Sequence, residues 1–365
     1  MAKKNNRHRI IKRLAEKSWK RNLRFKEKKK NRRKSLLSVN IYQRREINQK
    51  IQLKRQLSQY KHIKAPVFFS LAHNTEETLK FIEKIETCFK NKQKVFVDLS
   101  HVERLANGAI VVLLSILVNF KTHGIDFNGN FPKSIDAQQA LKNSGFFKYL
   151  YKNINLGESY TFENEICTHA SKKVDSQLSE EIIQKASVHI WGEERRCTGL
   201  QRVFLELMQN TNNHASLAKQ GEQHWWATIS PSKTEKKVSF AFIDYGIGIF
   251  ESLSNKPTEN KFYGAIDKLK SVFDFSSNAD ILKLLLNGDV HKTVTGKYYR
   301  GKGLPGIFNA CQSNKISNLI IISNDALADY SQGIYRKLNG KLSGTFVYWE
   351  LNENNVNIID NKNEN

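Results

Sequence analysis

Three polar side chains follow one another at four-residue spacing in a predicted helix that begins at Gly199. Glu206, Asn210 and His214 would therefore lie along one stripe of that helix. A carboxylate can orient a water molecule, an amide oxygen can bind Mg²⁺, and an imidazole can contact a phosphate group. The stripe alone is a weak indication of a site, because most polar helix faces only contact solvent.

Two glycine-containing segments further along the chain suit the binding of a nucleotide. The first, residues 244–248, begins with Asp244 directly after a predicted strand, and the second covers residues 301–306. Glycines in the second segment can bring backbone N–H groups against phosphate oxygens ahead of a helix. Arg300 and Lys302 are candidates for contact with a γ-phosphate. Glycines at this spacing are weak evidence for a nucleotide site on their own, and here they do not follow the early strand of a Rossmann unit.

Taken in order, these segments resemble the ATP-binding domain of the GHKL superfamily, which comprises gyrase, the heat-shock chaperone ATPases, the histidine kinases and MutL. The resemblance spans about 180–351, and His214-Ala215 is most similar to the anti-sigma serine kinases. It implies that Asn210 holds Mg²⁺, that Glu206 is the catalytic base, and that Asp244 accepts the adenine amino group. It also implies a wider set of ATP-binding residues: His214, Gly246, Gly248, Arg300, Gly301, Lys302, Gly303, Leu304, Gly306 and Thr345.

The stretch between the two glycine segments, 250–299, is longer than in the compact anti-sigma kinases. Helices are predicted at 263–271 and 278–287, and the stretch has a cationic end at 291–297. We expect it to be a lid that closes on the nucleotide, because it ends directly at the phosphate-binding glycines. A surface insertion without a catalytic role is the alternative.

The elements that must position these segments form a predicted α/β domain over 179–351. A linker or an edge hairpin is expected at 153–178 and a disordered tail at 352–365. Periodicity predicts two helices and four strands in the domain: helices at 179–190 and 199–213, and strands at 225–229, 238–243, 319–323 and 344–351.

A smaller α/β segment, 65–152, precedes this domain. Strands predicted at 67–71, 94–99 and 125–128 alternate with helices at 75–89, 107–121 and 135–149. The run from Val95 to Ser100, followed by Leu105 to Ala109 and an apolar helix, is similar to the STAS domain of anti-sigma-factor antagonists. That resemblance implies a phosphorylatable Ser before the glycine at the helix start. Asn107 stands there instead, and Asn caps a helix but cannot accept a phosphoryl group. An unrelated α/β module is the alternative.

The positive charge is concentrated in an N-terminal arm, residues 1–64. The chain carries +24, and the arm, with 24 Lys and Arg against 3 Glu, holds +21 of it. The arm has neither Gly nor Pro, which favours a helix. Such a charge density suits the phosphate backbone of a nucleic acid without sequence reading. Docking on an acidic protein or an anionic membrane surface, or a merely solvated tail, are the alternatives.

The spacing of the cysteines and the length of the apolar runs indicate the cellular location that we expect for the protein. The four cysteines lack the paired spacing of a zinc site or a disulfide framework, so we expect reduced thiols in a cytoplasmic, bacterial protein: Cys88, Cys167, Cys197 and Cys311. The longest apolar run, Ala109 to Val118, is too short to span a bilayer.

The sequence thus predicts an α/β protein with a basic helical arm, a STAS-like domain and a GHKL-type α/β sandwich. Its expected function is that of an Mg·ATP-binding regulatory ATPase, in which lid closure controls a partner or a nucleic-acid-bound assembly. A protein serine/threonine kinase acting on a separate STAS protein is the first alternative. A nucleic-acid-binding adaptor with a non-hydrolysing ATP pocket is the second. Protein partners of the STAS-like domain and a homodimer are left open.

Overall fold

The computed structural model describes the following residues: 2–37, 52, 57–150, 167–171, 174–215, 225–254, 277–288 and 303–355. They belong to two units, Met1–Tyr60 and Lys61–Asn365. The fold is mixed α/β, with parallel and antiparallel sheets, as the sequence predicts.

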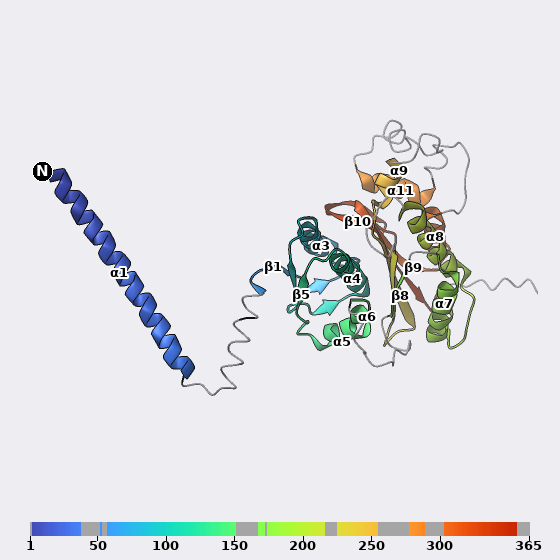
Figure 1. Cartoon of the computed structure of the whole chain (residues 1–365). Coiled ribbons are helices and arrows are strands. Elements are labelled where there is room, and N and C mark those ends of the chain that lie inside the picture. The colour runs from blue at the N-terminus through green and yellow to red at the C-terminus, as the bar shows by residue number, and fades with distance from the viewer. Residues whose placement is uncertain are drawn as a thin grey trace, which may run out of the picture. The chain divides into compact units, whose positions relative to one another are not determined.

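The first unit contains one long helix, α1 (Ala2–Leu37) (Figure 1). Seventeen Lys and Arg and two Glu lie in this helix, and the side chains of residues 13–33 are all exposed. A helix of this length extends for about 54 Å. The rest of the arm up to residue 56, apart from Gln52, lies outside the described residues.

The arm ends at Tyr60 rather than at Lys64. Lys61–Lys64 form a strand, β1, that pairs in parallel with Val95–Asp98 and so belongs to the second unit. Alternation in KHIK is too short to indicate a strand, and only the pairing with a distant segment makes it one.

The first part of the second unit, residues 61–150, is called the first module here. Its three-stranded parallel sheet has the order β1-β3-β5, and β2 and β4 form a separate parallel pair. The predicted strand 67–71 is reduced to two residues, and the predicted helix 135–149 is divided at Gly145, whose φ is 74°. The remaining elements are β2 (Phe68–Phe69), α3 (Thr75–Lys90), β3 (Val95–Asp98), β4 (Arg104–Leu105), α4 (Asn107–Thr122), β5 (Phe127–Gly129), α5 (Ile135–Asn143) and α6 (Phe146–Leu150).

The rest of the second unit, residues 167–355, is the second module. Its five-stranded antiparallel sheet has the order β6-β7-β8-β10-β9. The elements are β6 (Cys167–Ser171), α7 (Ser176–Trp191), α8 (Thr198–Ala215), β7 (Trp225–Pro231), β8 (Lys237–Asp244), α9 (Gly248–Ser254), α11 (Asn278–Asn287), α13 (Leu304–Gln312), β9 (Ser317–Asp329) and β10 (Ile334–Asn352).

Two predicted boundaries of the second module change. The expected linker 153–178 contains strand β6 and the start of α7, while 151–166 and 172–173 lie outside the described residues. The expected tail begins later than residue 352, because Asn355 is buried and its side chain bonds to Asn314 and Ser317. Nothing is described beyond residue 355.

Helices cover both faces of the five-stranded sheet (Figure 1). On one face, α7, α8, α11 and α13 pack on side chains such as Phe240, Phe242 and Trp349. On the other face, α3 and α4 of the first module pack on Ile243 and Phe346. The two modules therefore share a hydrophobic core and form one folded unit, whereas the sequence suggested two domains joined by a linker.

Part of the predicted lid, residues 250–299, belongs to the hydrophobic core of the second module. Its second helix, expected at 278–287, is α11 with those bounds, and four of its residues are buried in the core shared with α13 and β9: Ala279, Ile281, Leu282 and Leu286. Lid residues 255–276 and 289–299 lie outside the described residues.

Candidate functional site

The site is built on three neighbouring strands, at the level where β8 ends. Asp244 is the last residue of β8, its partner across the ladder is Thr345 on β10, and the partner of Thr345 on β9 is Ser323. Side chains alternate along a strand. Phe240 and Phe242 on β8, and Val347 and Trp349 on β10, contact the α8 core. Asp244 and Thr345 therefore face α8.

Asp244 is a carboxylate in a largely apolar surrounding. Its side chain is half-buried. Burial nevertheless raises its pKa from 3.8 to about 7, against a smaller opposing effect of the Thr211 hydroxyl on α8. Such a group is a strong acceptor for an N–H donor that reaches it.

The segment before Thr345 approaches the backbone of Asp244 very closely. Gly344 has a φ of 115°, and a Cβ atom there would collide with the carbonyl oxygen of Asp244. Only glycine fits, because it has neither the side chain nor the steric barrier to this conformation. Ser323 fixes the same place, donating to the Gly344 carbonyl over 3.1 Å and lying 3.2 Å from the Thr345 hydroxyl. The sequence motifs do not include Ser323, because its only distinguishing feature in the sequence is that it is polar and ends an apolar run.

Asn324, the residue after Ser323, contacts and stabilises the first glycine segment. Asn324 Nδ2 donates to the carbonyl of Ile247 over 3.1 Å, and its side chain fills the space that a Cβ of Gly248 would need. Gly248 also has a φ of 75°. Asn324, which the sequence analysis also missed, thus explains why position 248 is glycine.

The second glycine segment meets α8. Gly303 is the N-cap of α13, with a φ of 79°, and its N–H donates to Glu206 Oε2 over 2.7 Å. Asn210, one turn further along α8, is in contact distance of Gly303, since its Oδ1 would lie 3.8 Å from a Cβ there. The predicted carboxylate, amide and phosphate-loop glycine therefore converge, although 97 residues separate Glu206 from Gly303.

Other predicted site residues are placed in part. Gly246 lies against Asp244 Oδ1, and Leu304 and Gly306 occupy the first turn of α13. His214 lies in the last turn of α8, but its side chain is outside the described part. Three further residues lie outside it altogether: Arg300, Gly301 and Lys302.

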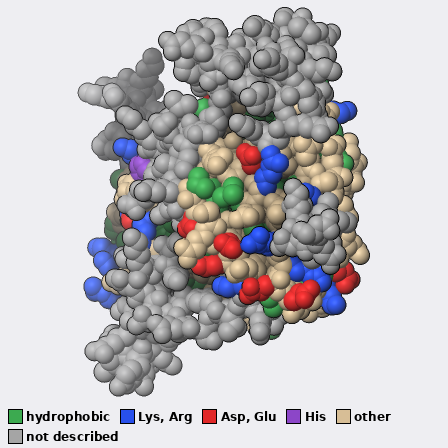
Figure 2. Space-filling view, turned by 90° about the vertical axis from the view of Figure 1, so that its right-hand side faces the viewer, with side chains coloured by type: hydrophobic (Ala, Val, Ile, Leu, Met, Phe, Trp, Pro, Cys, Tyr) green, Lys and Arg blue, Asp and Glu red, His purple; other side chains and the backbone are tan. Residues whose placement is uncertain are grey.

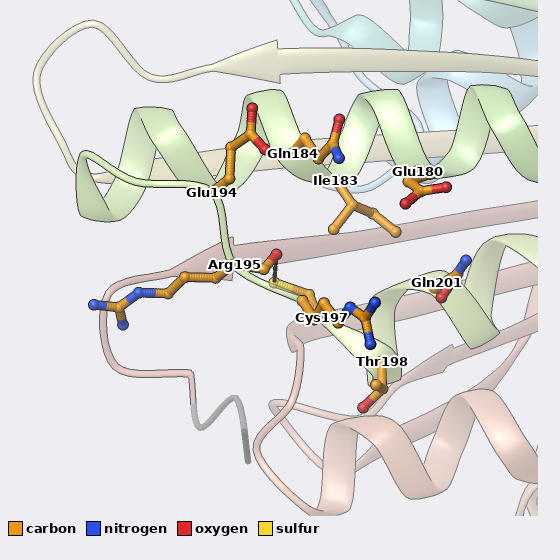
Figure 3. A pocket seen from close by; sticks show the side chains of 9 residues that line it. Glu180, Ile183, Gln184, Glu194, Arg195, Cys197, Thr198 and Gln201 are labelled. Carbon is orange, nitrogen blue, oxygen red and sulfur yellow. Dashed lines mark hydrogen bonds between the residues drawn. The ribbon is translucent and has the colours of Figure 1, made fainter. Parts of the chain in front are cut away.

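A separate hollow of about 460 Å³ lies between α7 and the start of α8, and none of the predicted site residues lines it (Figure 3). Burial raises the pKa of its Cys197 to about 11, so this thiol is protonated at neutral pH. Its Arg195 pairs with Glu193 over 2.7 Å. On this side of the molecule acidic and basic side chains are intermixed (Figure 2), which agrees with the near-neutral charge of the folded body.

Comparisons with family models, with curated proteins and with solved structures found no match for this chain. Within the described ranges, no helix is both long and apolar enough to span a bilayer.

Replacing Asp244 with Asn should increase stability while weakening ligand binding. The folded-state pKa of about 7 lies above the ordinary 3.8, so the folded state binds the proton more tightly than the unfolded state. The stability of the ligand-free parent should therefore fall as the pH rises from about 4 to about 7, and that of Asp244→Asn should not. At pH 8 we expect a melting temperature several degrees higher for the variant, at about 2–4 °C per kcal/mol.

If Asp244 accepts the adenine amine, as the GHKL resemblance implies, the same variant should bind ATP about 10- to 100-fold more weakly, because an amide is a poorer acceptor. In the parent, ATP affinity should rise with pH between 6 and 8 as the carboxyl ionises. Calorimetry and thermal unfolding over pH 5–8 measure both effects. A variant with a lower melting temperature at pH 8 and unchanged ATP affinity would contradict the assignment of Asp244.

Replacing Glu206 with Gln should separate binding from turnover. The Glu206 carboxylate accepts a hydrogen bond from the N–H of Gly303 and would repel a phosphate at that position. ATP should therefore bind about tenfold more tightly to Glu206→Gln. Phosphate release should fall by about a hundredfold or more, since an amide cannot act as a base. Glu181→Gln, an exposed carboxylate on α7, is the matched control. Weaker ATP binding by Glu206→Gln would contradict the repulsion argument, and an unchanged rate of phosphate release would show that the base lies elsewhere.

Proposed function

We propose that the second module is a GHKL-type site that binds Mg·ATP and hydrolyses it slowly. The observation that carries this proposal is the convergence of Asp244 and Thr345 with Glu206, Asn210 and Gly303 on the α8 face of one sheet. These residues come from four separate segments of the chain, and each has the chemistry that one part of the nucleotide requires.

At the adenine end, the carboxyl of Asp244 would accept the exocyclic amine, and the Thr345 hydroxyl next to it would contact the base through water. Guanine has a carbonyl oxygen where adenine has this amine, and that oxygen would face the carboxylate. The proposed site should therefore reject GTP.

At the phosphate end, the N–H of Gly303 would donate to a phosphate oxygen at the N-terminus of α13. The described part of the chain holds no cluster of three or more Asp, Glu, His or Cys that could enclose a metal ion. In the described part of the chain, the amide of Asn210 has no hydrogen-bond partner, and it lies beside Gly303. This donor set fits Mg²⁺, which takes one or two protein oxygens and otherwise phosphate and water. Bound there, Mg²⁺ would neutralise charge developing on the phosphates.

Glu206 would change partners during the cycle. Its carboxylate accepts from the N–H of Gly303 and lies 3.8 Å from Arg202. A phosphate that takes over the Gly303 N–H would free the carboxylate to orient a water molecule for attack on the terminal phosphorus. The same side chain would thus exchange its contact with Gly303 for the role of a base.

Phosphoryl transfer to the first module is disfavoured by geometry. Asn107, at the expected acceptor position, begins α4, and a Cβ on the neighbouring Gly108 would lie 2.6 Å from the Phe346 ring. Phe346 belongs to the opposite face of the sheet from Gly303 and Asn210. The sheet therefore separates this position from the proposed phosphate site, so a kinase activity would need a separate acceptor protein.

The proposal is tested with γ-labelled ATP and Mg²⁺, scoring free phosphate and protein-bound label. We expect free phosphate from the parent, none with GTP, and no label on either the parent or Asn107→Ser, because the sheet blocks transfer within the chain. Label on Asn107→Ser at a rate independent of protein concentration would contradict the geometric argument. Label on an added STAS protein would favour the kinase alternative.

For the arm we propose contact with nucleic acid through helix α1, whose side chains from 13 to 33 are all exposed. Residues 1–60 carry 22 Lys and Arg against 3 Glu, a net charge of +19. Their removal should leave the folded unit intact, whereas a deletion to residue 64 would also remove strand β1.

The parent should bind duplex and single-stranded oligonucleotides with a log K that falls against log salt at a slope of about −5 to −9, for roughly 6–10 phosphate contacts. Deleting 1–60 should abolish this binding, and replacing Lys28, Lys29 and Lys30 with Gln should reduce the slope by up to about 2.7. ATP hydrolysis is the control for folding. Equal affinity of the parent and the deletion, or a flat salt response, would assign the arm to another kind of partner.

A further inference from the structure

Helix α3 of the first module contacts strand β10 in the part that precedes Thr345. Three glutamates of α3 accept its hydrogen bonds: Glu76 from Arg336 Nη1 over 2.7 Å, Glu83 from the N–H of Lys341 over 2.6 Å, and Glu86 from Ser343 Oγ over 3.0 Å. Their spacing places them on one stripe of α3. Lys341 and Ser343 lie where the ladder between β10 and β9 is irregular, between residues 337 and 345, whereas Arg336 is still paired with Leu327. Glu83 therefore accepts a backbone N–H in a part of β10 whose pairing with β9 is irregular.

The last of these contacts lies next to the proposed adenine site. Ser343 directly precedes Gly344, the residue that touches the backbone of Asp244, and Thr345 follows. A displacement of Ser343 would therefore move the close approach of Gly344 to Asp244 and the hydroxyl of Thr345. Glu76 contacts the same strand farther from the site, because its carboxylate accepts from Arg336 and from the N–H of Asn339, nine and six positions before Thr345.

The other wall of the adenine site is also backed by the first module. Tyr245 follows Asp244, and its ring packs on the core shared with α3 and α4. Within the described ranges Glu86 Oε1 is buried without a hydrogen-bond partner. Burial, and next the negative charge of Glu86, raise the pKa of the Tyr245 hydroxyl, against a smaller opposing effect of the Ser115 hydroxyl. One carboxylate is therefore near both segments that bear the adenine-binding residues.

Burial also raises the pKa of Glu86. A half-satisfied buried carboxyl is costly for stability. Stability alone therefore does not account for a carboxyl at this position, and its place beside Ser343 and Tyr245 suggests another role.

We propose that Glu86 is a positioning residue for the nucleotide site, holding Ser343 and with it the Gly344–Thr345 segment against Asp244. The inference rests on the proposed ATP function and assigns part of its regulation to the first module. It follows that changes at α3 alter the affinity for the adenine end of the nucleotide. The chemical step, which depends on Glu206 and Gly303, should not change.

The test compares Glu86→Ala, Ser343→Ala and the double variant in the full chain, with Glu76→Ala as the matched control. We expect each single variant to weaken ADP and ATP binding by about fivefold, with the rate at saturating ATP unchanged. The double variant should bind no more weakly than the weaker single one, because both changes remove the same contact. Ser343→Thr, which keeps the hydroxyl, should restore binding. Glu76→Ala should lower the melting temperature without affecting nucleotide affinity.

Additive losses in the double variant, or an equal loss of affinity in Glu76→Ala, would overturn the positioning role. If the parent binds neither nucleotide, the proposed function fails, and amide exchange in the ligand-free protein decides the role of Glu86 separately. Faster exchange at 244–247 and 343–346 in Glu86→Ala than in Glu76→Ala supports the positioning role. Equal exchange in the two variants rejects it.

Discussion

The five-stranded sheet of the second module is buried on both faces, and most features of the folded unit follow from this constraint. Side chains alternate along a strand, so neighbouring residues of β8 and β10 serve different cores. Asp244 faces α8, while Tyr245 faces the first module. The proposed nucleotide site and an inter-module contact therefore use adjacent residues, and a shift of one strand residue would exchange the two faces.

Polar groups are kept in this buried frame at a cost in stability. The raised pKa of Asp244 follows from burial, and Glu86 lies half-satisfied between the modules. A core optimised only for stability would replace both with apolar or neutral residues. Both groups lie at the same end of the sheet, next to Gly344. The concentration of unfavourable polar groups at one place is typical of a functional site.

The electrostatics of the chain are divided between its two units. Helix α1 carries a dense positive charge on exposed side chains, whereas the folded unit is close to neutral. A self-repelling helix of this kind is favoured by contact with a polyanion. The proposed binding through the arm and the proposed chemistry at the sheet would thus depend on different forces, and salt should affect the first far more than the second.

The elements that could be predicted from the sequence alone are those whose signals are local. The apolar run of α4, the apolar period of α11, the charge of α1 and the residue types at Glu206, Asn210, Asp244 and Gly303 are properties of short segments. Which of these segments meet depends on the whole fold. Strands β1 and β6 depend on ladder bonds to distant partners, and Glu86 meets Ser343 across 257 residues. Short strands and carboxylate contacts have no periodicity of their own, because the partner that satisfies them is supplied by the fold.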